Sequence, residues 1–205
     1  LNTRQYATKG YLEKLIAQVF TGRERFEPGN PQEGYSPSPQ ERQSWLQISY
    51  MKEAYHTMGP KFTLGWMAEA LYSSKNFSEN YTATMMQAGE FAPTPHSKLM
   101  YNEAFRANQY VAAGIKPIYV LNDMFQFRTE FYGFTPIFPI KKNALNKAYY
   151  GKAFSRFEYM GEVSVICQLP FGAISAYVNH YSSPRREWNV GMTIGWQLFN
   201  YRFVE

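Results

Sequence analysis

The stretch EWNVGMTIGWQLFN, at residues 187–200, shows the clearest alternation in the 205-residue chain. Every second side chain from Trp188 to Leu198 is apolar, while small or polar residues such as Asn189 and Thr193 lie between them. Because successive side chains of a strand point to opposite faces, this pattern predicts a β-strand with one apolar face. Tryptophan near both ends with no charge between is typical of a strand that faces lipid. An inward-facing strand of a soluble sandwich is the alternative.

The composition excludes membrane-spanning helices but not a membrane-spanning barrel. The chain is 45% hydrophobic and 18% aromatic, with 17 Tyr and 16 Phe, yet its mean hydropathy is -0.45. A spanning helix needs about 20 apolar residues in a row. The best candidate, residues 163–178, is interrupted by Ser164, Gln168 and Pro170. A transmembrane barrel places its apolar residues in alternate positions and so has an ordinary average hydropathy.

The charge and the single cysteine exclude two further classes. The net charge is +5, but no basic helix or glycine-aromatic motif accompanies it, so we expect no nucleic-acid partner and assign the charge to solvated loops. Cys167 alone cannot build an internal disulfide framework. The chain begins with Leu1 and shows no charged-then-apolar leader, so we expect either a removed signal peptide or a fragment of a longer protein.

Eight further segments are predicted as strands from alternation and flanking turn signals. They are residues 2–7, 11–21, 44–56, 62–73, 106–121, 124–134, 153–169 and 173–181. The connections alternate in length, and the short ones are residues 8–10, 57–61, 121–124 and 170–172. The longer ones are residues 22–43, 74–105, 135–152 and 182–186. Short turns on one side and longer loops on the other are typical of an outer-membrane barrel.

The predicted fold is therefore all-β, an antiparallel transmembrane β-barrel with residues 1–205 as a single segment. Nine strands are predicted, whereas an antiparallel barrel closes with an even number, so we expect further strands in an N-terminal part of the parent protein. A soluble ligand-binding β-barrel or sandwich is the alternative, and dependence on detergent distinguishes the two.

Two short motifs resemble the BamA/TamA-type surface-antigen barrels of Gram-negative outer membranes. ATKGY, at residues 7–11, is similar to a periplasmic turn and the strand after it. The terminal pattern is similar to the barrel-insertion signal, carried here by Asn189, Gly191, Ile194 and Trp196. The resemblance implies the last nine strands of a 16-stranded barrel, with residues 74–105 as the sixth extracellular loop. It also implies outer-membrane lipid as surroundings and the barrel-assembly machinery as a partner during insertion.

Three stretches look more specifically like the barrel region of Bacteroidetes patatin-like phospholipases: GWQLFNYR at 195–202, AFRAN at 104–108 and FEPG at 26–29. The resemblance implies that the barrel anchors or translocates an upstream patatin-like domain of the same chain. The superfamily's sixth loop usually carries Val-Arg-Gly-Phe, of which only Arg106 after Phe105 is present. This departure argues against an insertase or polypeptide-transport role.

The chain shows no catalytic motif. A patatin needs a Gly-x-Ser-x-Gly elbow, and none of the 14 glycines begins one, so the resemblance places the catalytic residues of the parent upstream of Leu1. The alternative is an outer-membrane lipid-modifying enzyme, with His56, His96 and His180 and Ser49, Ser97 or Ser175 as candidates. These histidines are predicted at different heights along the barrel wall, which argues against a shared catalytic site. Neither metal-ligand spacing nor a phosphate-binding loop is present, so no metal or cofactor is expected.

Alternation places a charge cluster on the face opposite the apolar one, formed by Arg128, Glu130, Glu158 and Glu162. A solvated or salt-bridged lumen is the simple interpretation, and loop docking or transport is the alternative. Arg106 is predicted at the foot of the long loop, where its guanidinium would contact one of these glutamates and pin the loop inside the barrel. We expect four lysines to lie in solvated loops: Lys141, Lys142, Lys147 and Lys152. Contact of these lysines with lipopolysaccharide phosphates is the alternative.

The alternation also assigns each strand residue to a face. The outward set is Trp188, Val190, Met192, Ile194, Trp196, Phe62, Leu64, Trp66, Phe125, Phe127, Val163 and Val165. The lumen set is Gln197, Thr193, Glu69, Arg128, Glu130, Glu158 and Glu162. A register error of one residue would exchange the two sets.

Overall fold

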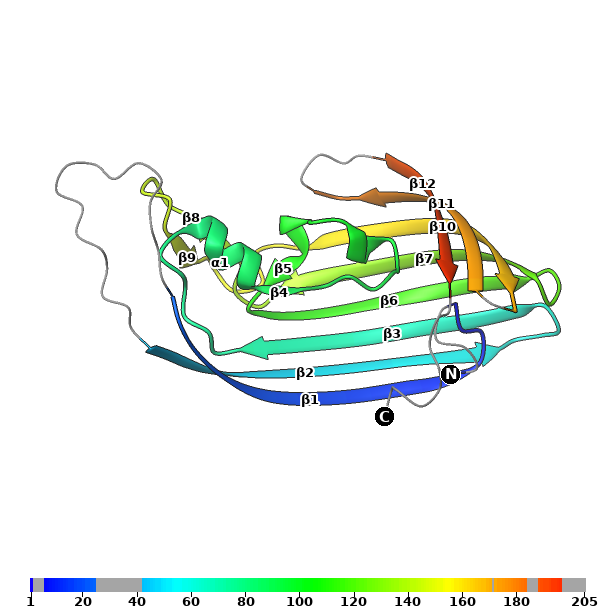
Figure 1. Ribbon diagram of the computed structural model, residues 1–205, viewed down its shortest axis with the longest axis horizontal. Helices are drawn as coiled ribbons and strands as arrows, with labels where there is room; N and C mark the ends of the chain where they lie inside the picture. The colour runs from blue at the N-terminus through cyan, green and yellow to red at the C-terminus, as the bar shows by residue number, and fades with distance from the viewer. Residues whose placement is uncertain (2–5, 25–41, 171, 184–187, 197–205) are drawn as a thin grey trace.

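The computed structural model contains one large antiparallel sheet that curls around a long segment packed on one of its faces (Figure 1). It describes residues 1, 6–24, 42–170, 172–183 and 188–196. The eight strands follow the order β1-β2-β3-β6-β7-β10-β11-β12, and each is antiparallel to its neighbours. Strands β1 and β12 are the two edges, so the described sheet is open.

The main strands are β1 (Gly10–Arg23), β2 (Arg42–Thr57), β3 (Phe62–Ser73), β6 (Gln109–Val120), β7 (Phe125–Pro136), β10 (Glu158–Leu169), β11 (Gly172–Tyr181) and β12 (Trp188–Trp196). The segment between β3 and β6 holds α1 (Tyr81–Gln87), β4 (Gly89–Glu90), the 3-10 turns η1 (Ser97–Leu99) and η2 (Glu103–Phe105), and β5 (Arg106–Ala107). The segment between β7 and β10 holds the hairpin of β8 (Ile140–Lys142) and β9 (Ala148–Tyr150).

The all-β antiparallel prediction and the alternation of short and long connections are confirmed. The strand predicted at residues 2–7 is wrong in its described part, since residues 2–5 lie outside the described residues and neither Tyr6 nor Ala7 is in a strand. Ala7 is instead buried beside Tyr55 and Ile118, and its carbonyl accepts a hydrogen bond from Arg128 Nη1 at 2.9 Å. Tertiary contacts of this short segment thus outweigh its local alternation.

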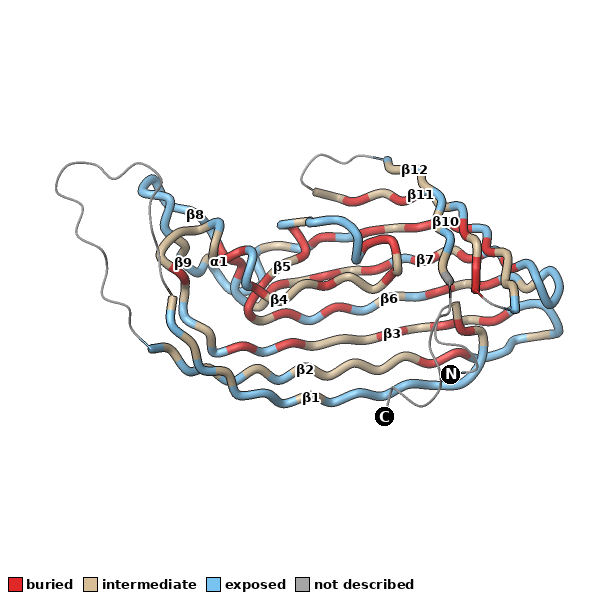
Figure 2. Tube along the Cα trace, in the orientation of Figure 1, coloured by how far each residue is buried: buried red, intermediate tan, exposed pale blue. Residues whose placement is uncertain are grey.

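Alternation gives the sheet two different faces, and buried and exposed residues follow each other along the strands in Figure 2. We call the face against which residues 74–105 pack the covered face, and the opposite one the exposed face. The aromatic rings of Phe91 and Phe105 fill the space between this segment and the covered face. They pack against Phe134 with centroids 5.9 and 5.6 Å away, so burial of aromatic surface holds the segment to the sheet.

The two predicted sets lie on opposite faces of the sheet wherever the structure describes the side chain. Half-buried or exposed residues of the apolar set are Trp188, Val190, Met192, Ile194, Phe62, Leu64, Trp66, Phe125, Phe127, Val163 and Val165. Buried on the covered face are Arg128, Glu130, Glu158 and Glu162, with Glu69 and Thr193 partly buried. Gln197 and the side chain of Trp196 lie outside the described residues.

Candidate functional site

A connected polar group on the covered face surrounds His96 in the segment between β3 and β6. The turn that presents it is rigid, because Pro93 and Pro95 fix their own φ angles. Thr94 and Ser97 close the turn reciprocally: the Thr94 amide donates to Ser97 Oγ at 3.0 Å, and the Ser97 amide donates to Thr94 Oγ1 at 3.1 Å. His96 therefore projects from a closed turn toward β10 and β11.

His96 connects this turn to two strands. Its Nδ1 lies 2.7 Å from Glu162 Oε1 on β10, and its Nε2 lies 3.1 Å from Ser175 Oγ on β11. The Thr94 hydroxyl donates to the other Glu162 oxygen at 3.1 Å. The imidazole also stacks on the Tyr177 ring with a centroid distance of 3.6 Å. We call Tyr6, Thr94, His96, Glu162 and Ser175 the His96 cluster.

With Glu162 ionised and His96 neutral, the partners assign the proton positions in the His96 cluster. An ionised carboxylate only accepts hydrogen bonds, so Nδ1 of His96 carries a proton and donates to Glu162. In a neutral imidazole Nε2 is then an acceptor, and the Ser175 hydroxyl donates to it. The Tyr6 hydroxyl donates to Ser175 Oγ at 2.9 Å. Burial raises the pKa of Tyr6, which keeps this hydroxyl a donor.

A second charged group on the same face surrounds Arg128. Its Nε and Nη2 donate to Glu130 Oε1 at 3.1 and 2.9 Å, and the Tyr132 hydroxyl donates to the other Glu130 oxygen at 2.9 Å. Lys116 pairs with Glu53 nearby. A cavity of 710 Å³ separates this group from the turn of His96, and its lining includes Tyr6, Glu53, Glu69, Pro95, Lys98, Lys116, Arg128 and Glu130.

Glu158 belongs to a third group, at the first residue of β10. Arg156 Nε donates to Glu158 Oε1 at 2.9 Å, and its Nη2 donates to the carbonyl of Ala104 at 2.6 Å. Ser182 donates to Glu158 Oε2. The predicted charge cluster is therefore three separate groups, in which only Arg128 and Glu130 contact each other directly.

The predicted contact of Arg106 with Glu130, Glu158 or Glu162 is wrong. Arg106 Nη2 donates to Glu90 Oε2 at 2.7 Å, and its Nη1 donates to the carbonyl of Met86 at 3.1 Å. The reason is local, since β4 and β5 pair in register and set Arg106 opposite Glu90. The segment does dock on the covered face through Glu162, but His96 supplies the contact.

The three candidate histidines contact different residues and do not meet one another, but one of them, His96, does meet a candidate serine. His96 reaches Ser175 because its turn dips along the covered face, whereas Ser97 bonds within its own turn. His56 accepts from Trp66 Nε1 at 3.3 Å on an exposed surface. His180 lies between Tyr159 and Trp188, with ring centroids 6.1 and 4.8 Å away. Ser49 is partly buried on β2.

Tyr6 and Thr94 were not among the residues expected from the sequence. The sequence signal for Thr94 is the Pro-Thr-Pro-His run at residues 93–96, because two prolines around a hydrogen-bonding residue favour a rigid turn. Tyr6 gives no such signal, since its role depends on Ser175, far away in the sequence. The residues Asn189, Gly191 and Ile194 of the proposed insertion signal lie on the edge strand β12.

Comparison of the chain with protein-family models, curated proteins and solved structures gives no match. Among the described residues, no helix is long and apolar enough to cross a membrane. The same residues contain no group of three or more His, Cys, Asp or Glu side chains placed to hold a metal ion.

Proposed function

We propose that the chain is part of the wall of a bacterial outer-membrane β-barrel, which anchors or translocates an upstream patatin-like phospholipase domain. The observation that carries the barrel part is the segregation of charge between the faces of β3, β6, β7, β10, β11 and β12. Their charged side chains all stand on the covered face: Glu69, Lys116, Arg128, Glu130, Glu158 and Glu162.

Water does not require this segregation, whereas lipid does. A charged side chain at the bilayer midplane of a barrel costs about 2–4 kcal/mol, while an exposed charge in water costs little. The strands β3, β6, β7, β10, β11 and β12 are 9 to 12 residues long. A transmembrane strand needs about 9–11 residues, so these lengths suit a bilayer.

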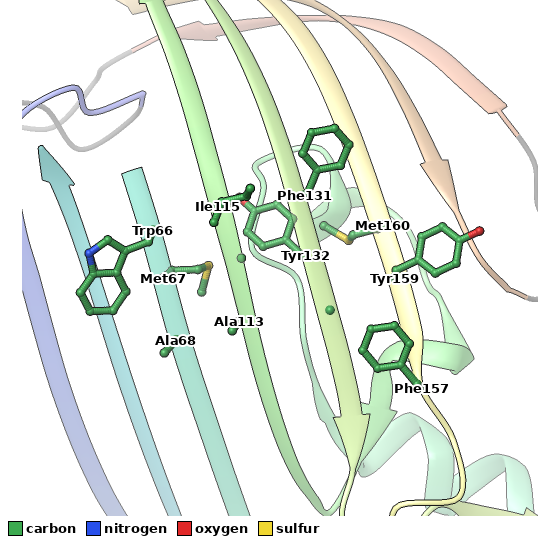
Figure 3. A pocket seen from close by; sticks show the side chains of 12 residues that line it. Trp66, Met67, Ala68, Ala113, Ile115, Phe131, Tyr132, Phe157, Tyr159 and Met160 are labelled. Carbon is green, nitrogen blue, oxygen red and sulfur yellow. The ribbon is translucent and has the colours of Figure 1, made fainter. Parts of the chain in front are cut away.

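The exposed face is also apolar where it is hollow (Figure 3). A depression of 480 Å³ lies over Ala68, Ala113 and Gly133, which are paired neighbours on three adjacent strands. Trp66, Ile115, Phe131, Phe157 and Tyr159 line its sides. A soluble ligand site would be expected to place a few polar groups in such a hollow, and this lining is uncharged.

Strands β1 and β2 are an exception on the exposed face. Lys52 Nζ lies 3.4 Å from Glu13 Oε2, and both side chains are exposed. The Tyr50 hydroxyl also donates to Glu13 at 2.7 Å. The ion pair and the further hydrogen bond compensate the charge of Glu13, which lowers the cost of placing it beside lipid. The barrel proposal also requires β1 and β12 to pair with further strands, since lipid cannot satisfy the backbone groups of an open edge.

Detergent dependence tests the barrel against the soluble alternative. We expect the purified chain to sediment as aggregate without detergent and to float with lipid vesicles after refolding. A monodisperse protein in plain buffer that does not bind vesicles would instead favour a soluble ligand-binding β-fold. The anchoring role rests on the motif resemblance and is tested separately, by asking whether a patatin-like domain fused ahead of Leu1 becomes membrane-bound.

A further inference from the structure

We propose that Ser175, His96 and Glu162 form an acyl-transfer site in which the Ser175 hydroxyl is the nucleophile and His96 the general base. This activity goes beyond a wall or anchor and does not depend on whether the exposed face meets lipid. The three residues come from β11, from the turn before η1 and from β10, so no local motif forces them together.

The hydrogen-bond chain has the direction that nucleophilic catalysis needs. Glu162 accepts from His96 Nδ1 at 2.7 Å and thereby leaves Nε2 free to accept the Ser175 proton at 3.1 Å. Ser164, two residues from Glu162 on the same face, is equally buried and has no histidine contact, so it serves as an internal reference.

Tyr6 supplies a hydrogen-bond donor to the site, and it also lines the neighbouring cavity. Its hydroxyl donates to Ser175 Oγ at 2.9 Å, so it can reach an oxyanion that forms on an acyl carbon bonded to Oγ. Tyr6 also lines the 710 Å³ cavity, together with Leu12, Met51, Met67 and Leu99. The walls combine these apolar side chains with charged ones such as Glu69, Lys98 and Lys116, so the cavity suits a carboxylic ester that carries both apolar and polar groups.

Buried polar atoms without partners lie on the same part of the covered face. Both polar atoms of the Asn179 side chain and the hydroxyl of Tyr181 have no hydrogen-bond partner among the described residues. Asn179 is the direct strand partner of Glu162. Unsatisfied buried polar groups are rare in folded proteins, so Asn179, four residues along β11 from Ser175, is the candidate contact for the alcohol part of a bound ester.

The proposed step is ordinary ester cleavage. Ser175 Oγ forms a bond to the ester carbonyl carbon while His96 Nε2 takes the hydroxyl proton. The bond to the alcohol oxygen then breaks, and that oxygen leaves with the proton from His96. Water attacks the acyl-serine in the same manner, which releases the carboxylic acid and restores the Ser175 hydroxyl.

The test is covalent labelling of the full chain with an alkyl fluorophosphonate, followed by mass spectrometry of the labelled peptide. We expect an adduct on Ser175 that is absent in Ser175→Ala and unchanged in Ser164→Ala. His96→Gln should slow labelling by about 10²-fold or more, since that is the usual contribution of a general base. Tyr6→Phe should slow it less while circular dichroism and loop proteolysis stay unchanged.

Glu162 is a positioning residue in this proposal, and the pH profile separates it from a merely structural partner. Glu162→Gln keeps the shape of the side chain but can donate to Nδ1, which leaves the proton on the wrong nitrogen. We expect slower labelling with a changed pH dependence in a protein whose segment is still docked. If a folded wild-type chain forms no adduct on Ser175, or if His96→Gln speeds labelling by uncovering Ser175, the proposal is overturned while the barrel proposal stands.

Discussion

On strand β7, Phe125, Phe127 and Phe131 stand on the exposed face, and Arg128 and Glu130 alternate with them on the covered face. The two faces are only one residue apart in the sequence. The two charges of β7 on the covered face pair with each other, Arg128 Nη2 lying 2.9 Å from Glu130 Oε1, whereas the exposed face of β7 has no charge to pair. The environment of a strand residue therefore depends on whether its position in the alternation is odd or even, more than on which residues are next to it in the sequence.

The largest expected effect is on the covered face, where removing one partner leaves a buried charge. Arg128→Met should lower the free energy of unfolding by about 3–5 kcal/mol, because Glu130 loses its guanidinium partner. Equilibrium unfolding in detergent micelles or vesicles measures this. The double variant Arg128→Met with Glu130→Gln should recover much of the loss. A single variant as stable as the wild type would contradict the view that this face depends on paired charges.

A charge on the exposed face should have the next largest effect, and only in lipid. Val165→Arg places a guanidinium on an exposed position of β10 and should lower stability in vesicles by about 2–4 kcal/mol. The matched control is Leu145→Arg in the turn between β8 and β9, where the side chain is also exposed and little change is expected. Equal stability of both variants in vesicles would remove the distinction between the two faces.

Removing the imidazole of His96 should have a smaller, local effect. His96→Ala leaves Glu162 and Ser175 without their partner, which costs about 1–3 kcal/mol for such buried polar groups. Because the segment still packs through Phe91 and Phe105, we expect local opening around residues 93–99 rather than global unfolding. Hydrogen exchange of these amides measures it, with His56→Ala as the exposed control. Unchanged protection would mean that the His96 cluster does not hold the segment.

The smallest effect is expected for the ion pair on the exposed face of β1 and β2. Lys52→Ala removes the partner of Glu13, but both side chains are exposed and Tyr50 still donates to the carboxylate. The unfolding midpoint of the Lys52→Ala variant in micelles should match that of the wild type. A loss as large as that of Arg128→Met would show that this part of the exposed face is also shielded from water.

Alternation was sufficient to predict the eight strands of the large sheet and the faces of their described residues. The period of two in β7 and β10 fixes which side Arg128 and Glu162 occupy, because the strand itself imposes that geometry. Strand positions and the lengths of the connections followed from the same pattern and from the turn residues. Closure of the sheet did not follow, since pairing at an edge depends on which strand comes beside it.

The contacts that side chains make on the covered face could not be predicted from the alternation of apolar and polar residues. Arg106 was assigned to distant glutamates, yet Glu90 lies opposite it in a two-residue ladder that has too few residues to show alternation. His96 meets Ser175 across 79 residues through a rigid turn, and the sequence carries only the prolines of that turn as a signal. Long-range contacts of irregular segments therefore remained beyond sequence reasoning, even where the right glutamate, Glu162, had been named.

The exposed face is proposed to meet lipid, and tryptophan quenching tests this contact most directly. Two single-tryptophan variants are compared in vesicles of lipids with brominated acyl chains. One keeps Trp66 on the exposed face and the other keeps Trp45, whose ring lies under Lys75 Nζ at 4.6 Å. We predict strong quenching of Trp66 and weak quenching of Trp45. Equal, weak quenching of both in vesicle-bound, folded protein would contradict the account.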